Sequence, residues 1–206
     1  MHQHQYLEDI TFLVVEDNPF MRRIVMRILW AFGAKRVEEA SDGGEAITAM
    51  ESFQPDIIVL DWEMEPVDGI QFMKFVRDAE DSKNPFIPVI MLTGHAERHR
   101  IITARNAGVN EYLLKPVSAQ ALLSRVQAVI ERPRQFVRTK TFFGPDRRRK
   151  DERFKGDNRR AGGAAAPRAG AEAEAMDAEM HQDEINELFN PEDGQSETED
   201  TAAGQG

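Results

Sequence analysis

The sequence predicts an α/β fold, a doubly wound five-stranded parallel sheet with helices on both faces. Two observations lead to this prediction. Short continuous apolar runs, such as residues 57–60, lack the alternation of surface strands and are typical of parallel strands buried on both faces. Segments with apolar residues at helical spacing separate these runs. Regular alternation of strand and helix favours right-handed crossovers, which place helices on either side of one sheet.

The expected elements can be placed along the chain from these patterns. The strands lie at residues 11–15, 36–40, 57–60, 87–92 and 111–114. Asn18–Pro19 provide an N-cap and a first-turn proline for the first helix, which stops at Gly33. Further helices are expected around residues 46–50, after Asp68–Gly69, from about residue 95 to 107, and after the capping residue Ser118.

The composition is that of one ordinary globular domain with additional residues. The chain has 206 residues, of which 41% are hydrophobic. Its apolar stretches are far shorter than the roughly 20 residues that a bilayer requires, and residues 1–5 lack the features of a signal peptide. The absence of cysteine excludes disulfides and thiolate metal sites. We therefore expect a cytoplasmic protein without membrane insertion.

The net charge of −10 is distributed in three blocks that suggest a domain organisation. Residues 9–131 contain the predicted strands and helices and carry an excess of acids. Residues 132–160 are strongly basic and are interpreted as a linker, because they show no helix-turn-helix pattern or second domain. Residues 161–206 form an acidic C-terminal tail that we expect to be mostly disordered, apart from a short motif at residues 180–190.

Polar residues of related chemistry end four of the expected strands: Glu16–Asp17, Asp61, Thr93 and Lys115. These ends share one edge of a parallel sheet, so the residues can converge on one cleft. Three acids suit Mg²⁺, and with that ion bound an aspartate can attack a phosphoryl group while Lys and Thr stabilise its oxygens. Singly, each residue also suits an ordinary role such as a helix cap or a solvated strand end. Their joint occurrence at the strand ends favours a functional site for Mg²⁺ and a phosphoryl group.

With these residues in order at the expected strand ends, the sequence resembles the receiver domain of bacterial two-component response regulators, most closely the single-domain chemotaxis type. The resemblance covers about residues 9 to 131 and implies a flavodoxin-like fold. It also implies that Asp61 is the phospho-acceptor. Asp17 would bind Mg²⁺ directly, Glu16 would act largely through water, and Glu63 would contribute its backbone carbonyl.

The same resemblance implies roles for residues near the fourth and fifth strands. Thr93 and Lys115 would contact the phosphoryl oxygens, and the Lys115–Pro116 bond would be cis. Tyr112 would be a rotating switch aromatic, acting with Thr93 and Pro116.

The loop after Asp61 departs from the family pattern. Met64 is followed by Glu65, so that the proline falls one residue late, at Pro66. The loop is therefore expected to differ in shape. Glu63 and His95 occupy positions that tune dephosphorylation in the family, although His95 also suits a solvent-facing place in the first turn of a helix.

The basic linker contains a loose repeat with the pattern Phe-x-Gly-x-Asp/Asn-Arg-Arg, at residues 142–148 and 154–160. Paired arginines beside an aromatic residue can bind nucleic acid or an acidic protein surface. A solvated linker, or one that docks on the acidic domain of the same chain, is the favoured interpretation.

The tail contains one short amphipathic motif. Ile185, Leu188 and Phe189, together with Met180, form an apolar face among acids. Residues 182–189 resemble the N-terminal peptide of flagellar motor switch proteins, which binds phosphorylated chemotaxis receivers. We therefore expect this motif to fold on a partner, which is a receiver of this chain or of another.

The sequence as a whole predicts a phosphorelay response regulator that signals through protein contacts rather than a DNA-binding output domain, and that is not an enzyme. Its expected partners are a sensor histidine kinase, a downstream protein of chemotaxis or flagellar type, and Mg²⁺. Two alternatives remain open. An aspartate-nucleophile phosphatase would need a second acid two residues after Asp61, where Glu63 stands, and a substrate cap. A nucleic-acid-binding adaptor would depend on the arginine repeats.

Overall fold

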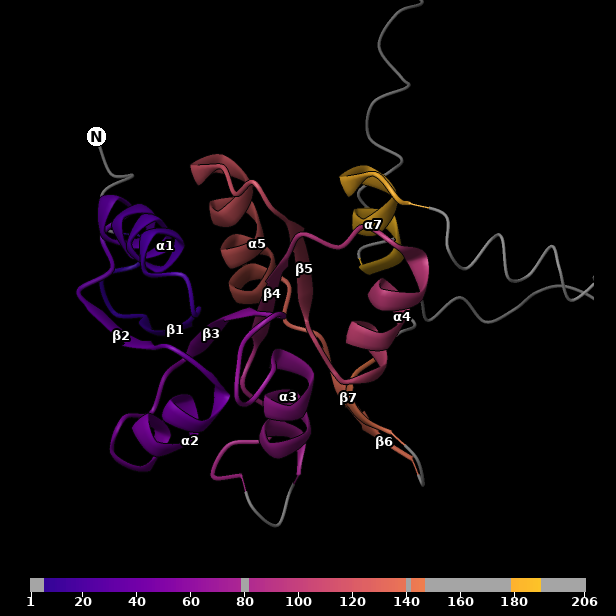
Figure 1. Cartoon of the computed structure of the whole chain (residues 1–206), viewed down its shortest axis with the longest axis horizontal. Coiled ribbons are helices and arrows are strands. Elements are labelled where there is room, and N and C mark those ends of the chain that lie inside the picture. Colours follow the sequence, from indigo (N-terminus) through magenta and orange to yellow (C-terminus); the bar gives the residue numbers. More distant parts are fainter. Residues whose placement is uncertain (1–5, 79–81, 140–141, 147–178, 190–206) are drawn as a thin grey trace, which may run out of the picture.

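The computed structural model describes residues 6–78, 82–139, 142–146 and 179–189. Its centre is a five-stranded parallel sheet in the order β2-β1-β3-β4-β5 (Figure 1). The strands are β1 (Thr11–Val15), β2 (Arg36–Ala40), β3 (Ile57–Asp61), β4 (Val89–Thr93) and β5 (Glu111–Leu114). The predicted doubly wound sheet is thus confirmed.

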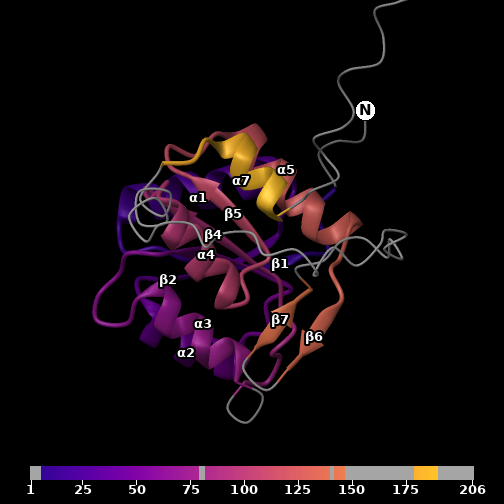
Figure 2. The same cartoon turned by 90° about the vertical axis from the view of Figure 1, so that its right-hand side faces the viewer.

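Five helices cover the two faces of the sheet. They are α1 (Pro19–Ala31), α2 (Gly43–Ser52), α3 (Gly69–Arg77), α4 (Arg98–Asn106) and α5 (Ala119–Glu131). Buried residues of α1 and α5 share one apolar cluster with Phe12, Val14 and Val59. Those of α2, α3 and α4 share the other with Leu13 and Leu60. Figures 1 and 2 show this arrangement as helices on both sides of the sheet.

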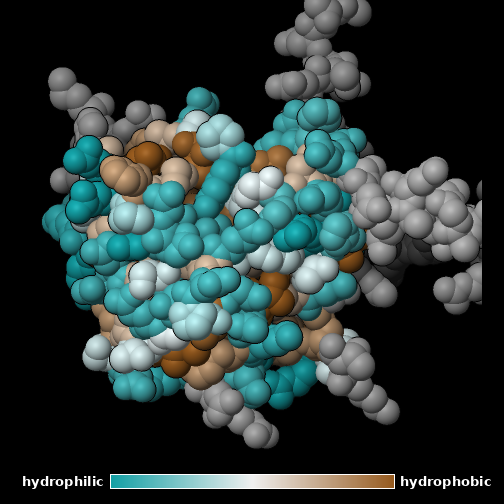
Figure 3. Space-filling model, viewed as in Figure 1, coloured by the Kyte–Doolittle hydropathy of each residue, from teal (hydrophilic) through white to brown (hydrophobic). Residues whose placement is uncertain are grey.

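Each central strand is buried on both faces because consecutive side chains enter opposite clusters. In β3, Ile57 and Val59 pack toward α1 and α5, whereas Ile58 and Leu60 pack toward α2, α3 and α4. Polar residues lie mainly outside these clusters, and Figure 3 shows hydrophilic residues over most of one face of the molecule, with hydrophobic residues in small patches. No described helix is long and apolar enough to cross a membrane.

The helix starts follow the local capping chemistry. The side chains of Asn18, Asp42 and Ser118 accept hydrogen bonds from backbone N–H groups in the first turns of α1, α2 and α5. Asp68 forms a reciprocal capping box with Gln71 at the start of α3.

The fourth helix begins at Arg98, three residues later than the predicted start at His95. The N–H of His95 instead donates to the Thr93 hydroxyl, and Glu97 has extended backbone angles and provides no side-chain cap. The Thr93 hydroxyl thus holds the first residues after β4 outside the helix.

The chain beyond the receiver-like region forms two further described elements. A small antiparallel hairpin, β6 (Phe136–Arg138) and β7 (Phe143–Pro145), follows α5 directly. A short helix, α7 (Gln182–Phe189), lies beside β5 (Figures 1 and 2). The described part of the predicted linker is therefore folded as a hairpin. The second arginine repeat, and the predicted tail apart from residues 179–189, lie outside the described residues.

Arg77 ties the hairpin to the sheet. Its buried guanidinium donates hydrogen bonds to the carbonyl oxygens of Pro85, Ile87 and Gly108, at 2.8–3.0 Å. It also donates to Oδ1 of Asn110 at 3.0 Å and lies 5.0 Å from the ring centre of Phe136 in β6. One side chain thereby holds together the segments that enter β4 and β5.

Candidate functional site: an acidic cluster at the carboxyl ends of the strands

The fold brings the predicted site residues to one edge of the sheet. Glu16 and Asp17 directly follow β1, Asp61 ends β3, Thr93 ends β4 and Lys115 directly follows β5. Because all five strands are parallel, these positions share the carboxyl edge, where open α/β sheets bind ligands.

Asp61 is almost completely buried, with 4% of its surface exposed. Its Oδ1 accepts a hydrogen bond from the Trp62 N–H at 2.7 Å and lies 2.9 Å from Nζ of Lys115. The same ammonium lies 2.9 Å from Oε2 of Glu16 and donates to its Oε1 at 3.2 Å. Lys115 therefore bridges the two buried acids, Glu16 and Asp61.

Glu16, Asp17 and Asp61 form the only described cluster of possible metal-ligating side chains, counted over residues 6–78, 82–139, 142–146 and 179–189. One carboxylate oxygen from each lies within 4.8 Å of the others. Oε2 of Glu16 is buried beside the Lys115 ammonium. Three hard oxygen donors at this spacing fit a Mg²⁺ ion, which in proteins binds a few carboxylates together with water and phosphate oxygens.

The electrostatics of the cluster reflect its burial. Burial raises the pKa of Glu16 to about 7, an effect that Lys115 opposes and the neighbouring charge of Asp61 reinforces. Burial also raises the pKa of Asp61, although the hydrogen bond from Lys115 acts to lower it. For Lys115, burial favours a lower pKa, but the contacts with Glu16 and Asp61 outweigh it and the pKa is raised. A divalent cation would relieve this crowding of acids.

His95 links two residues near the acidic cluster, Thr93 and Glu63. Its N–H donates to Oγ1 of the buried Thr93 at 3.0 Å, and its Nε2 lies 2.6 Å from Oε1 of Glu63. The Glu63 side chain thus turns toward His95.

An open depression of about 480 Å³ beside Asp61 is lined by Asp17, Trp62, Glu63, Met64, Glu65 and Asp68. The backbone carbonyl of Glu63 remains a predicted ligand.

Tyr112 is buried, with 1% of its surface exposed, and its hydroxyl donates to the carbonyl oxygen of His95 at 2.9 Å. Burial raises the pKa of Tyr112, so the phenol keeps its proton. The Lys115–Pro116 and Glu65–Pro66 peptide bonds are both cis. The ring of Tyr112 stacks on that of Phe189 and belongs to the same apolar cluster as Ile185; its role as a switch remains a prediction.

The loop between β3 and α3 folds back onto Asp61 at Gly69. The Gly69 N–H donates to the carbonyl oxygen of Trp62 at 2.9 Å. A Cβ atom at Gly69 would lie 2.3 Å from the Asp61 carbonyl oxygen, which is far below van der Waals contact. Only glycine allows α3 to begin this close to the acid.

The predicted partner motif lies away from the acidic cluster. Ile185 and Phe189 are buried, with 0% and 2% of their surfaces exposed, and Leu188 is partly buried against the same apolar cluster. The motif thus packs on the receiver-like domain, beside Tyr112.

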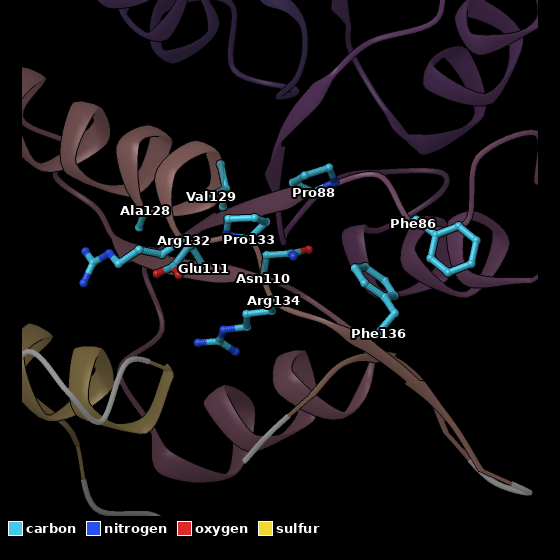
Figure 4. Close-up of a pocket in the computed structure, with 10 residues that line it drawn as sticks. All are labelled: Phe86, Pro88, Asn110, Glu111, Ala128, Val129, Arg132, Pro133, Arg134 and Phe136. Atoms are coloured by element: carbon cyan, nitrogen blue, oxygen red, sulfur yellow. The ribbon is translucent and has the colours of Figure 1, made fainter. Parts of the chain in front are cut away.

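A second pocket, of about 200 Å³, lies at the opposite end of the sheet (Figure 4). Pro88 and Asn110, which line it, directly precede β4 and β5, whereas Asp61 lies at the other ends of the strands. The remaining lining comes from the loop before β4, from the first residue of β5, from α5, and from the segment that leads into and begins β6. This pocket is therefore not part of the acidic cluster.

We expect Asp17→Ala to weaken Mg²⁺ binding without unfolding the protein. Asp17 is exposed and is one of only three clustered carboxylates, so its loss leaves mostly water to hold the ion. Isothermal titration with Mg²⁺ would measure the change, with Asp9→Ala, an exposed acid outside the cluster, as the control. Unaltered Mg²⁺ affinity in Asp17→Ala would remove Asp17 from the site.

Comparison with known proteins agrees with this geometry. Residues 12–127 match the family described as the response regulator receiver domain. The chemotaxis protein CheY-3 of Vibrio cholerae is 37% identical over 125 residues, which cover 61% of this chain and 95% of that protein. The chemotaxis protein CheY of Pseudomonas aeruginosa is 39% identical over 120 residues, covering 58% and 95%.

Solved structures give the same result. The chemotaxis protein CheY4 of Vibrio cholerae superposes with a TM-score of 0.54 at 30% identity, over 59% of this chain and 98% of that one. The receiver domain of the Francisella response regulator 1452 gives a TM-score of 0.51 at 29% identity, over 60% and 98%. The family match spans more than half of the chain and includes Glu16, Asp17, Asp61, Thr93 and Lys115. The chain belongs to the response regulator receiver domain family.

Proposed function

We propose that this protein is a phosphorylation-dependent switch in which Asp61 accepts a phosphoryl group from a sensor histidine kinase. The observation that carries the proposal is the pairing of Asp61 with Lys115 at 2.9 Å, next to two further carboxylates, at the carboxyl edge of the sheet. Glu16, Asp17 and Asp61 would hold a Mg²⁺ ion, with the Glu63 carbonyl as a further ligand.

The transfer requires a nucleophile and stabilisation of the phosphoryl oxygens. A carboxylate oxygen of Asp61 forms a bond to phosphorus as the bond from phosphorus to the donor breaks, and the donor leaves with that electron pair. A Mg²⁺ ion held by Glu16, Asp17 and Asp61 would supply positive charge that neutralises the phosphoryl oxygens. The Lys115 ammonium, already within 2.9 Å of Asp61, and the Thr93 hydroxyl at the end of β4 contact the remaining oxygens.

The output is proposed to be a change in protein contacts, with a downstream chemotaxis or flagellar partner, in the cytoplasm. The names of the relatives CheY-3 and CheY, both chemotaxis proteins, support this pathway. A switch of this kind transfers a phosphoryl group to itself and need not turn over a substrate, so we do not class it as an enzyme.

A phosphatase acting on other substrates is less well supported by the geometry. In that mechanism the acid two residues after the nucleophile would face the substrate. Here Glu63 stands at that position, but its Oε1 lies 2.6 Å from the His95 ring and 3.9 Å from Arg100. The carboxylate is therefore already engaged at the rim of the site.

Incubation of the full chain with acetyl phosphate separates these two functions. We expect stoichiometric phosphorylation of the protein that disappears when Mg²⁺ is chelated, measured by intact-protein mass spectrometry. Inorganic phosphate release should stay close to the slow hydrolysis of the phosphoprotein. Rapid, repeated turnover of several phosphate esters without accumulation of phosphoprotein would contradict the switch and favour a phosphatase.

A further inference from the structure

The segment 179–189, which we name the tail segment, is packed on the domain rather than exposed. Its helix α7 lies beside β5, between α4 and α5 (Figures 1 and 2). Ile185 and Phe189 enter the apolar cluster that contains Tyr112, and Met180 and Leu188 pack against it. The apolar face that the sequence predicts is therefore covered by the receiver domain of the same chain.

The tail segment also satisfies backbone groups at the sheet edge. β5 is the last strand of the sheet, so its outer N–H and C=O groups have no neighbouring strand. The Gln182 side chain fills this place, because its Oε1 accepts from the Leu114 N–H at 2.8 Å and its Nε2 donates to the Tyr112 carbonyl at 3.1 Å. One amide side chain thus makes the pair of bonds that another strand would make, and this fixes the position of α7.

Two further polar contacts set the orientation of the tail segment. The buried Arg125 of α5 donates to Oδ1 of Asn186 at 2.5 Å. At the start of the segment, the Met180 N–H donates to the Ala96 carbonyl at 2.8 Å, and Glu179 pairs with Glu97 as an antiparallel bridge. The segment is therefore held at α5, at β5 and at the loop before α4. Such directional contacts at several points distinguish a specific docked state from general hydrophobic adhesion.

Tyr112 connects the tail segment to the phosphorylation site. The ring of Phe189 stacks on that of Tyr112, with centroids 5.9 Å apart and planes inclined by 19°. The Tyr112 hydroxyl donates to the carbonyl oxygen of His95, whose N–H donates to Thr93. Thr93 ends the strand next to β3, which carries Asp61. A short chain of contacts thus runs from Phe189 to Thr93, the residue proposed to contact the phosphoryl group.

From these contacts we propose that the tail segment is the receiver's own ligand for the β5 edge, and that its docking and the phosphorylation of Asp61 favour each other through buried Tyr112. This inference rests on the proposed function. The occupant of the β5 edge is residues 179–189 of the same chain, and a downstream protein that uses this surface must displace them.

The coupling follows from linkage between two states of one side chain. Phe189 stacks on the buried ring of Tyr112, and Ile185 belongs to the same apolar cluster, so docking favours the buried position. If a phosphoryl group held by Thr93 also favours that position, each event strengthens the other by the same factor. The tail segment then has two effects. It promotes phosphorylation, and it covers the surface that Tyr112 helps to form.

Amide exchange tests the docking directly in the full chain. The Leu114 N–H is bonded to Gln182, so we expect Gln182→Met and the double variant Ile185→Ala/Phe189→Ala to accelerate its exchange, on the order of 10-fold or more. Glu187→Ala is the matched control, because Glu187 is exposed on the same helix. Equal exchange in all variants would overturn the docking. Exchange that accelerates in wild-type protein on 100-fold dilution would show that a second copy, not the same chain, supplies the segment.

Phosphorylation by acetyl phosphate with saturating Mg²⁺ tests the coupling. We expect the Ile185→Ala/Phe189→Ala variant to be labelled on Asp61 about 5-fold more slowly, or more, than Glu187→Ala. Phosphorylation should in turn slow Leu114 exchange in the control. Accelerated Leu114 exchange together with unchanged labelling would overturn the coupling. Absence of labelling in every variant would instead refute the proposed function, while Leu114 exchange would still report the docking.

Discussion

Asp61→Asn is expected to abolish labelling by acetyl phosphate while the domain remains folded. The asparagine keeps the shape and an oxygen that can accept from the Trp62 N–H, but its neutral amide is not a nucleophile for phosphorus. The change also removes a buried carboxylate whose pKa is raised by burial, so we expect no loss of stability. Intact-protein mass spectrometry and thermal unfolding would measure the two effects.

Asp68→Asn provides the matched control for this experiment. It makes the same chemical change at the rim of the same depression, and asparagine also serves well as the N-cap of α3. The control should be labelled at the wild-type level. Undiminished labelling of Asp61→Asn would place the phospho-acceptor elsewhere and remove the basis of the proposed function.

Arg77→Met is expected to lower the free energy of unfolding by about 3–5 kcal/mol, because several buried acceptors lose a charged donor and each unsatisfied group costs about 1–3 kcal/mol. The methionine fills much of the space but leaves the carbonyl groups of Pro85, Ile87 and Gly108 without their donor. It also removes the cation from the ring of Phe136. Urea unfolding followed by circular dichroism would measure this loss.

Arg23→Met is the control, because Arg23 is exposed on α1 and its replacement should change stability by no more than about 0.5 kcal/mol. Similar effects of the two substitutions would contradict the role of Arg77. A smaller loss at Arg77, accompanied by faster amide exchange confined to residues 136–145, would show that Arg77 holds only the hairpin.

The sheet and the acidic cluster could be predicted because their signals are local. Two-sided burial produces continuous apolar runs, and parallel topology then fixes which strand ends meet, whatever the intervening side chains are. The start of α4 could not be predicted, since it depends on a hydrogen bond from the His95 N–H to the Thr93 hydroxyl. The pairing of His95 with Glu63 joins residues on separate loops and leaves no pattern in the sequence.

Two contributions to the fold carry no recognisable sequence signal. Arg77 lies in the last turn of α3, where a basic residue is expected simply as a solvated partner of the helix dipole. Its burial depends on carbonyl groups from distant loops. Gln182 similarly appears as one polar residue among acids, and its bonds to β5 cross a gap of about 70 residues. The apolar face of α7 was visible in the sequence, whereas the surface that receives it required the structure.

The position of Gly69 implies unequal tolerance to mutation around the site. With no room for a methyl group against the Asp61 carbonyl oxygen, any side chain at Gly69 must move either α3 or the strand that carries the nucleophile. Gly94, directly after Thr93, has nothing within 4 Å of an added Cβ. Variation across homologous chains should therefore be accepted at Gly94 and rejected at Gly69, although neither residue has a side chain to take part in the chemistry.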